Sequence, residues 1–458
     1  MHETTTKPQS LLRVLFRSDT LAFGYGTAAL LWAVGYFTHI PQWTLPSWMV
    51  FILLLSALFL SGIYAGYRLQ QSIYSGLCIG FIAAVLNILV LGSLITGDRP
   101  NQVVPSALIF IPGSIIVTML LTTAGAWVGK MLRSAPPKPV NGISAFAAVG
   151  VLTTFLLLLA GGLVTSWDAG LAVVDWPNSF GYNMFLYPLS RMTGGIYYEH
   201  THRLIGSLVG LTTLMLAILI QVRDKRGWVK GLAWSAFVLV VFQGILGGLR
   251  VTGNFTLSTS PEAMQPSLTL ALIHGVTGQI FFALLTCLAV ITSGPWQRES
   301  SIEKPSCATD RILFPLAFAA LIIQLVLGAT VRHYAEGLML HIGFAVVVFT
   351  VVMTSAVRAW GIYPEKQTLS NLGLWVLSVL CIQFILGFTA LWGITADPDP
   401  QVYRWFEVLF PTLHQAFGAL LLALVVTKTI WFYRAIQPLS IAVAADPAPD
   451  TPARPQSA

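Results

Sequence analysis

The chain has 458 residues, of which 55% are hydrophobic and only 9% are charged, and its formal net charge is +7. A set of soluble domains is excluded, because such domains carry about 25% charged residues. The excess of positive charge does not form a basic stripe with interleaved aromatic residues, so no nucleic-acid partner is expected. We predict an all-α polytopic protein embedded in the lipid bilayer.

Twelve apolar segments follow one another along the chain, each long enough to cross the hydrocarbon layer. They are expected near residues 20–40, 47–67, 75–97, 105–129, 144–165, 202–221, 230–250, 266–292, 312–332, 338–359, 370–393 and 407–433. Every second connection carries the lysines and arginines, which places both termini in the cytoplasm. No cleaved signal peptide is recognisable, so the first segment is expected to act as the targeting signal.

The connection at residues 130–142, with three prolines, is the best domain boundary. Residues 1–140 before it form a membrane extension of four segments whose function the sequence does not indicate. After it we predict two tandem, pseudo-symmetric four-helix bundles, at residues 141–300 and 301–436. Residues 437–458, rich in alanine and proline, are predicted to form a disordered cytoplasmic tail.

An internal repeat relates the two predicted bundles. The Gln-x-x-Leu-Gly pattern at 243–247 recurs 140 residues later at 383–387, and a third copy lies at 324–328. His274 and His414 are likewise 140 residues apart, and His202 and His341 are 139 apart. Such a fixed spacing indicates two copies of one structural unit.

Four histidines each lie near the outer end of a different core helix, with a small residue four positions later on the same helix face. They are His202 with Gly206, His274 with Gly278, His341 with Ala345 and His414 with Gly418. An imidazole beside a gap is what a flat macrocycle needs, and haem iron takes imidazole axially. We predict one haem site per bundle, from His202 with His274 and from His341 with His414; the alternative for a single histidine is a bond to a backbone carbonyl.

The other histidines are expected to be structural rather than haem ligands. His2 lies in the polar N-terminal stretch, His39 ends the first segment and His333 ends the ninth. His200 is adjacent in sequence to His202 and therefore points about 100° away around the helix.

Arg203, Arg250 and Arg332 lie near the outer surface, against the usual inward bias of positive charge. Haem propionates would account for them, because guanidinium pairs well with carboxylate. The alternative is an arginine that extends from a helix end to the membrane surface.

The first predicted bundle differs from the second in two ways. Glu199 shares a helix face with His202, whereas the matching position in the second half is Leu338. The Gly-Leu pair at 170–171 also lies about 30 residues before its histidine, which gives only the first half a long external loop. We expect this half to receive a substrate and Glu199 to transfer protons there. The haem of the second half is expected to be a stable electron-transfer or structural haem. The alternative for Glu199 is that it only pairs with Arg203.

From residue 144 to 435 the chain resembles the haem A synthase family, the membrane enzymes that convert haem O to haem A for cytochrome oxidase. The motifs that carry the resemblance are Glu199-x-x-His202-Arg203, Gly170-Leu171 followed by Asp175-Trp176-Pro177, Gln243-Gly244-x-Leu246-Gly247-Gly248-Leu249-Arg250-Val251 and the three remaining histidines. The resemblance implies haem O between His202 and His274, with Glu199 serving its oxidation, and a haem B cofactor on His341 and His414. A ring methyl group would become hydroxymethyl and then formyl.

Two features depart from that family. Many bacterial relatives have cysteine pairs in their outer loops, whereas this chain has none there, so it resembles the cysteine-free branch found also in mitochondria. Cys78, Cys287 and Cys381 lie in apolar segments and Cys307 in an inner loop, and we expect neither a disulfide nor a cysteine metal site. The four leading segments are also additional; haem O synthase and oxidase assembly factors are candidate partners for them.

The resemblance favours a bacterial cytoplasmic membrane over the mitochondrial inner membrane as the location of the protein. Two other classes of membrane protein fit the arrangement of the histidines less well. A dihaem cytochrome b-type electron carrier commonly has two histidines on each of two helices, whereas here four helices carry one each. A haem transporter would place its site at the membrane midplane between matched halves, whereas these histidines lie toward one face.

Overall fold

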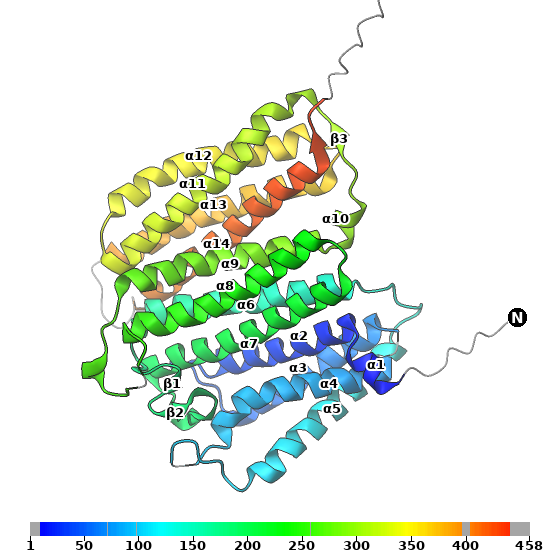
Figure 1. The fold of residues 1–458 in the computed structure, drawn as a ribbon, viewed down its shortest axis with the longest axis vertical. Helices are drawn as coiled ribbons and strands as arrows, with labels where there is room; N and C mark the ends of the chain where they lie inside the picture. The colour runs from blue at the N-terminus through cyan, green and yellow to red at the C-terminus, as the bar shows by residue number, and fades with distance from the viewer. Residues whose placement is uncertain (1–9, 71, 98, 257, 396–403, 440–458) are drawn as a thin grey trace, which may run out of the picture.

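The computed structural model describes residues 10–70, 72–97, 99–256, 258–395 and 404–439, so most of the predicted C-terminal tail lies outside the described residues (Figure 1). In the described part, twelve helices are long and apolar enough to cross a membrane, which confirms the predicted all-α polytopic fold and the number of spans. They are α2 (Ser18–Thr38), α3 (Ser47–Arg68), α4 (Ser72–Leu91), α5 (Ala107–Met131), α6 (Gly142–Ser166), α7 (Gly194–Arg223), α8 (Gly227–Thr252), α9 (Leu268–Ile291), α11 (Ala308–Tyr334), α12 (Leu338–Ile362), α13 (Gln367–Thr395) and α14 (Arg404–Ala435).

The remaining elements are short and lie in the connections. Helix α1 (Leu11–Leu15) precedes α2, and α10 (Gly294–Arg298) follows α9. Strands β1 (Asn178–Ser179) and β2 (Tyr182–Asn183) form an antiparallel hairpin in the long external loop, with Ser179 opposite Tyr182. Strands β3 (Ile302–Glu303) and β4 (Ile436–Gln437) pair in parallel at the other end of the helices.

The long helices form three groups stacked along the longest axis of the molecule (Figure 1). Helices α2–α5, in blue and cyan, lie at one end. Helices α6–α9 form a four-helix bundle in the middle, and α11–α14 form a second one at the far end. Helix α14 packs against both α6 and α9, so it joins the two bundles directly.

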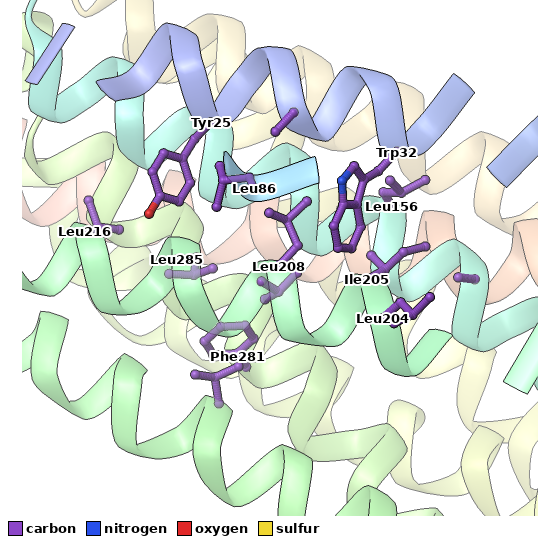
Figure 2. Packing of buried hydrophobic residues seen from close by; sticks show 14 of the residues in the cluster. Tyr25, Trp32, Leu86, Leu156, Leu204, Ile205, Leu208, Leu216, Phe281 and Leu285 are labelled. Atoms are coloured by element: carbon purple, nitrogen blue, oxygen red, sulfur yellow. The ribbon is translucent and has the colours of Figure 1, made fainter. Parts of the chain in front are cut away.

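The extension is joined to the first bundle by a shared hydrophobic core (Figure 2). Tyr25 and Trp32 of α2 point toward α6 and α7, where they meet Leu156 and Leu208. Leu285 of α9 belongs to the same cluster, so one apolar core runs from α2 into the middle of the bundle. The extension is therefore not a loosely attached module.

Within the extension, glycines on α3 and α5 bring the two backbones into close contact. The pairs Gly62 and Gly66 on α3 and Gly125 and Gly129 on α5 each have the Gly-x-x-x-Gly spacing. A Cβ atom at any of them would overlap a backbone carbonyl oxygen of the facing helix. This is how membrane helices associate where no hydrophobic effect drives them together.

Replacing Gly129 with alanine is therefore expected to destabilise the extension by about 1–3 kcal/mol, the usual cost of overpacking. Its methyl group would collide with the carbonyl of Ile63. Gly113 of the same helix has open space around its Cα, so Gly113→Ala is the matched control. A lower melting temperature for the first variant only is the expected result; equal melting temperatures would contradict the close packing of α3 and α5.

Helix α7 begins at Gly194, eight residues before the predicted start at residue 202. Glu199, His202 and Arg203 consequently lie within the helix rather than at its mouth. The sequence here is polar, yet Glu199 and His200 are only 2% and 0% exposed. The external loop supplies Ser179 as the partner of His200, whereas Arg203 and Arg250 pair with Glu199. The prediction of this boundary was wrong because it was based on hydrophobic residues. A polar helix turn that is covered by a loop has too few of them to be recognised.

Candidate functional site

Two histidine pairs lie in equivalent places in the two bundles. His202 of α7 faces His274 of α9, with ring centroids 6.4 Å apart and planes at 81°. His341 of α12 faces His414 of α14, with centroids 6.3 Å apart and planes at 82°. The structure therefore brings together the residues that the sequence paired, with nearly the same geometry twice.

The spacing within each pair fits one metal ion held from opposite sides. A metal–imidazole bond is about 2 Å long, and the ring centre lies roughly 1 Å beyond the nitrogen, so two imidazoles on one ion have centroids about 6 Å apart. No group of three or more histidine, cysteine or acidic residues that could hold a metal occurs among the described residues. Two axial imidazoles fit haem iron, whose other ligands come from the porphyrin.

Each imidazole packs against a glycine of the preceding helix, and the same ring edge faces the glycine in all four cases. A Cβ at Gly161, Gly247, Gly328 or Gly387 would lie 3.0, 3.2, 3.0 or 3.1 Å from Cε1 of His202, His274, His341 or His414, respectively. Added methyl groups would therefore crowd the rings. These glycines explain the Gln-x-x-Leu-Gly repeat, whose last residue leaves room for a histidine.

The first member of the repeat pattern also faces the histidine. Nε2 of Gln324 lies 3.2 Å from Nδ1 of His341, and Nε2 of Gln383 lies 3.4 Å from Nε2 of His414. Among the described residues, Nδ1 of His202, His274 and His414 is buried without a hydrogen-bond partner. Gly161 could not be recognised as a further copy of the Gln-x-x-Leu-Gly pattern, because Leu157 stands in place of its glutamine.

The small residues that follow the histidines face a neighbouring helix rather than an open gap. A Cβ at Gly206, Gly278 or Gly418 would lie 3.9, 3.6 or 3.2 Å from the side chain of Leu157, Gln243 or Gln383, respectively. A methyl group would make ordinary contacts at Gly206 and Gly278 and would be crowded only at Gly418. That these small residues make room for a macrocycle stays a prediction.

Glu199 lies between two arginines in the first bundle. Its Oε1 accepts a hydrogen bond from Nε of Arg203 at 3.1 Å, and its Oε2 accepts one from Nη2 of Arg250 at 3.1 Å. The Glu199 side chain is 3% exposed. The sequence anticipated the first partner and missed the second, which comes from α8. At the matching place in the second bundle, Leu338 begins α12.

Arg203 also anchors the external loop over the first bundle. It donates hydrogen bonds to the carbonyl oxygens of Val173, Asp175 and Asn178, at 2.9, 2.7 and 3.1 Å. The Asp175 carboxylate in turn accepts hydrogen bonds from the backbone N–H groups of Phe180 and Gly181, at 2.6 and 2.8 Å, and so shapes the turn of the β1–β2 hairpin. The loop is thus built around the arginine.

The loop docks on α8 as well. The Trp176 indole packs directly on Gly248, where any Cβ would overlap the ring. Arg250 donates a hydrogen bond to the carbonyl of Gly170 at 3.0 Å. Gly170, Trp176, Gly248 and Arg250 all belong to the motifs singled out in the sequence, so these motifs join the loop to the wall of the first site.

The three arginines predicted to hold propionates have different surroundings. Arg203 already forms four hydrogen bonds, to Glu199 and the loop. Arg250 forms two, and its charge acts on both His202 and His274. Arg332 donates to the carbonyl of Thr165. The pairing with propionates stays a prediction, for which Arg250 and Arg332 have more free donors than Arg203.

The other described histidines lie outside the two pairs. His200 is buried, its Nδ1 is 3.0 Å from Oγ of Ser179, and its ring centroid is 5.0 Å from that of Tyr187, so it holds the external loop. His39 contacts the carbonyl of Gly35 at 2.8 Å. His333 lies at the end of α11 beside Arg332, and His2 lies outside the described residues.

Fold and site together define an integral membrane protein with an eight-helix core, one histidine pair in each four-helix bundle, and a carboxylate held by arginines in the first bundle. Residues 144–342 match the cytochrome oxidase assembly protein family, COX15-CtaA. The chain is 30% identical over 182 residues to the heme A synthase of Alkalihalophilus pseudofirmus (34% of this chain, 59% of that protein). Over residues 144–342 the chain is thus similar to this family, and over part of its length it is similar to heme A synthases.

Two further relatives extend the comparison. The chain is 25% identical to the heme A synthase of a Caulobacter species over 367 residues, which covers 68% of this chain and 99% of that protein. It is 30% identical over 174 residues to a protoheme IX farnesyltransferase of Haloarcula marismortui, covering 38% of this chain and 34% of that protein. The chain thus spans about 59% of the Alkalihalophilus relative and about a third of the Haloarcula one.

Proposed function

We propose that this protein is a haem A synthase, which oxidises the ring methyl group of haem O stepwise to the formyl group of haem A for cytochrome oxidase. The observation that carries the proposal is the combination of two matching histidine pairs with a one-sided cluster of Glu199, Arg203 and Arg250. The two histidine pairs of like geometry would provide two haem sites. The cluster of Glu199, Arg203 and Arg250 would make the site in the first bundle chemically different from the site in the second.

In this proposal the two bundles have different roles. His202 and His274 flank the substrate haem O, and His341 and His414 hold a resident haem B. The cofactor supplies electron-transfer chemistry when it is bound, and the protein supplies position and electrostatics. The long loop between α6 and α7 lies over the first bundle, whereas the described connection between α11 and α12 is short. The first pair is therefore the one suited to receiving a substrate.

The residues around the first pair would position the substrate and keep water out. Trp176, seated on Gly248, places an indole at the wall of the site. Arg250, and at the bundle interface Arg332, would pair with propionates. Glu199 compensates one of the two positive charges of Arg203 and Arg250 and keeps both side chains in place, and we propose that it also takes part in proton transfer during the oxidation.

A partner that supplies haem O or receives haem A is a further part of the proposal, with the extension as its binding surface. Deleting residues 1–140 is a poor test of this idea, because Tyr25 and Trp32 belong to the core of the first bundle. Leu108 and Ile109 of α5 are 83% and 80% exposed and distant from that core. Substitutions at Leu108 and Ile109 would leave the shared core intact. Whether a partner still co-purifies with these variants is therefore the better test.

The proposed function is tested by expressing the protein with a supply of haem O, purifying it, and identifying the extracted haems by chromatography and mass. We expect haem B together with haem O, its hydroxylated form or haem A. Two haem B molecules per chain and no other haem would instead favour a dihaem electron carrier. A protein without any haem would contradict the assignment of the histidine pairs.

A further inference from the structure

An open cavity of about 620 Å³ lies at the end of the helices remote from the external loop. Four segments that are distant in sequence converge on it: the start of α6, the α7–α8 turn, α10 and the end of α14. They contribute Ile143, Arg223, Asp224, Lys225, Arg226, Trp228, Trp296, Gln297 and Arg434. Figure 1 shows α10 at the end of the bundles opposite to β1 and β2. The basic residues at this end make it the cytoplasmic one.

The cavity carries an excess of positive charge. Asp224 is its one acidic side chain, and both carboxylate oxygens bind Arg226, at 3.0 and 2.7 Å. This hydrogen bonding lowers the pKa of Asp224, so the two groups neutralise each other. Arg223, Lys225 and Arg434 are left as three uncompensated cations.

Most of the donors on these three cations are unused. Arg223 donates one hydrogen bond, to the carbonyl of Phe16 at 3.1 Å. Neither the Lys225 side chain nor the Arg434 side chain forms a hydrogen bond or ion pair with any other residue that the structure describes. Three cations from the ends of α7 and α14 and the turn between α7 and α8 therefore face one cavity whose only carboxylate is already paired with Arg226. This arrangement is unfavourable unless a ligand supplies a further anion.

Aromatic residues place the cavity at the level of the membrane surface. Trp228 is 57% exposed and lies 5.7 Å from the Arg226 guanidinium. Trp296 stacks edge-on against Trp431, with centroids 5.4 Å apart. Tryptophan is enriched where lipid head groups meet the hydrocarbon layer, and basic pockets between helices on the cytoplasmic side bind anionic head groups.

We propose that this cavity binds the phosphodiester head group of an anionic phospholipid from the cytoplasmic leaflet. The volume suits a group of that size, and the excess of cations selects an anionic lipid over a zwitterionic one. The bound phosphate would lie between the α7–α8 turn of the first bundle and the end of α14 in the second. It would therefore hold together the helices that carry His202 and His414.

The test titrates detergent-purified protein with phosphatidylglycerol and counts bound lipid by native mass spectrometry. The variant Lys225→Gln with Arg434→Gln is expected to bind about thirtyfold more weakly, since each basic residue near a membrane surface contributes roughly a fivefold effect. Lys138→Gln is the matched control, because Lys138 is exposed on the same side and outside the cavity. Without lipid, all three proteins should melt at the same temperature, and phosphatidylglycerol should stabilise only the wild type and the control.

Two results would overturn the proposal. Equal phosphatidylglycerol affinity in the double variant and the wild type would remove the cavity as the binding site. Displacement of the lipid by inorganic phosphate at a similar concentration would identify a site for free anions instead. Phosphatidylcholine serves as the zwitterionic comparison, and we expect it to bind equally weakly to all variants.

Discussion

Replacing His341 with alanine is expected to remove haem B from the purified protein while haem O still binds to the first bundle. His341 and His414 face each other with ring centroids 6.3 Å apart, so this substitution would remove one of the two imidazoles proposed to hold haem B. The substitution also empties the space beside Gly328 that the ring fills. Haem B retained per folded chain should fall by about tenfold or more, measured by extraction and chromatography.

His202→Ala is the reciprocal variant and should have the opposite pattern, with haem B retained and haem O lost. His39→Ala is the neutral control, because His39 lies in the extension, where its Nδ1 contacts the carbonyl of Gly35 and the hydroxyl of Thr38. Both haems should remain bound in that protein. Equal loss of haem B from the His341 and His202 variants would refute the division of roles between the two bundles.

The number and order of the helices could be predicted because membrane spans are encoded locally, by length and hydropathy. The repeat added information that hydropathy lacks. Because matching intervals separated His202 from His341 and His274 from His414, the sequence indicated which histidines occupy equivalent helices. The pairing across each bundle followed from that equivalence, since equivalent helices of two copies occupy equivalent places.

Contacts between distant segments could not be predicted in the same way. Arg250 lies 51 residues after Glu199, and nothing in either local pattern indicates that the two side chains meet. The packing of α3 on α5 depends on glycines of both helices. In the sequence these glycines cannot be told apart from the other small residues of a membrane segment. The external loop buries polar residues in the first turns of α7. Because these turns are not hydrophobic, the start of the helix was predicted too late in the sequence.

Replacing Glu199 with glutamine is expected to lower haem A formation by about 100- to 10,000-fold, the usual contribution of general acid–base catalysis, while both haems stay bound. Glutamine keeps the size and one acceptor oxygen for Arg203 or Arg250, but it does not take up a proton. Glu199→Ala is a harsher change, because it leaves two buried guanidiniums unpaired and should cost about 3–5 kcal/mol of stability. Product should therefore be measured per haem-containing chain, by mass.

A purely structural role for Glu199 leads to a different result. If the carboxylate only held the two arginines and the loop, Glu199→Gln would lose product in proportion to lost haem O, and the residual enzyme would turn over normally. Asp19→Asn is the matched control, since Asp19 pairs with Arg17 at 2.6 Å in the extension, far from the histidine pairs. Full haem O occupancy with almost no product in the Glu199 variant alone would establish a chemical role, whereas normal turnover at full occupancy would exclude one.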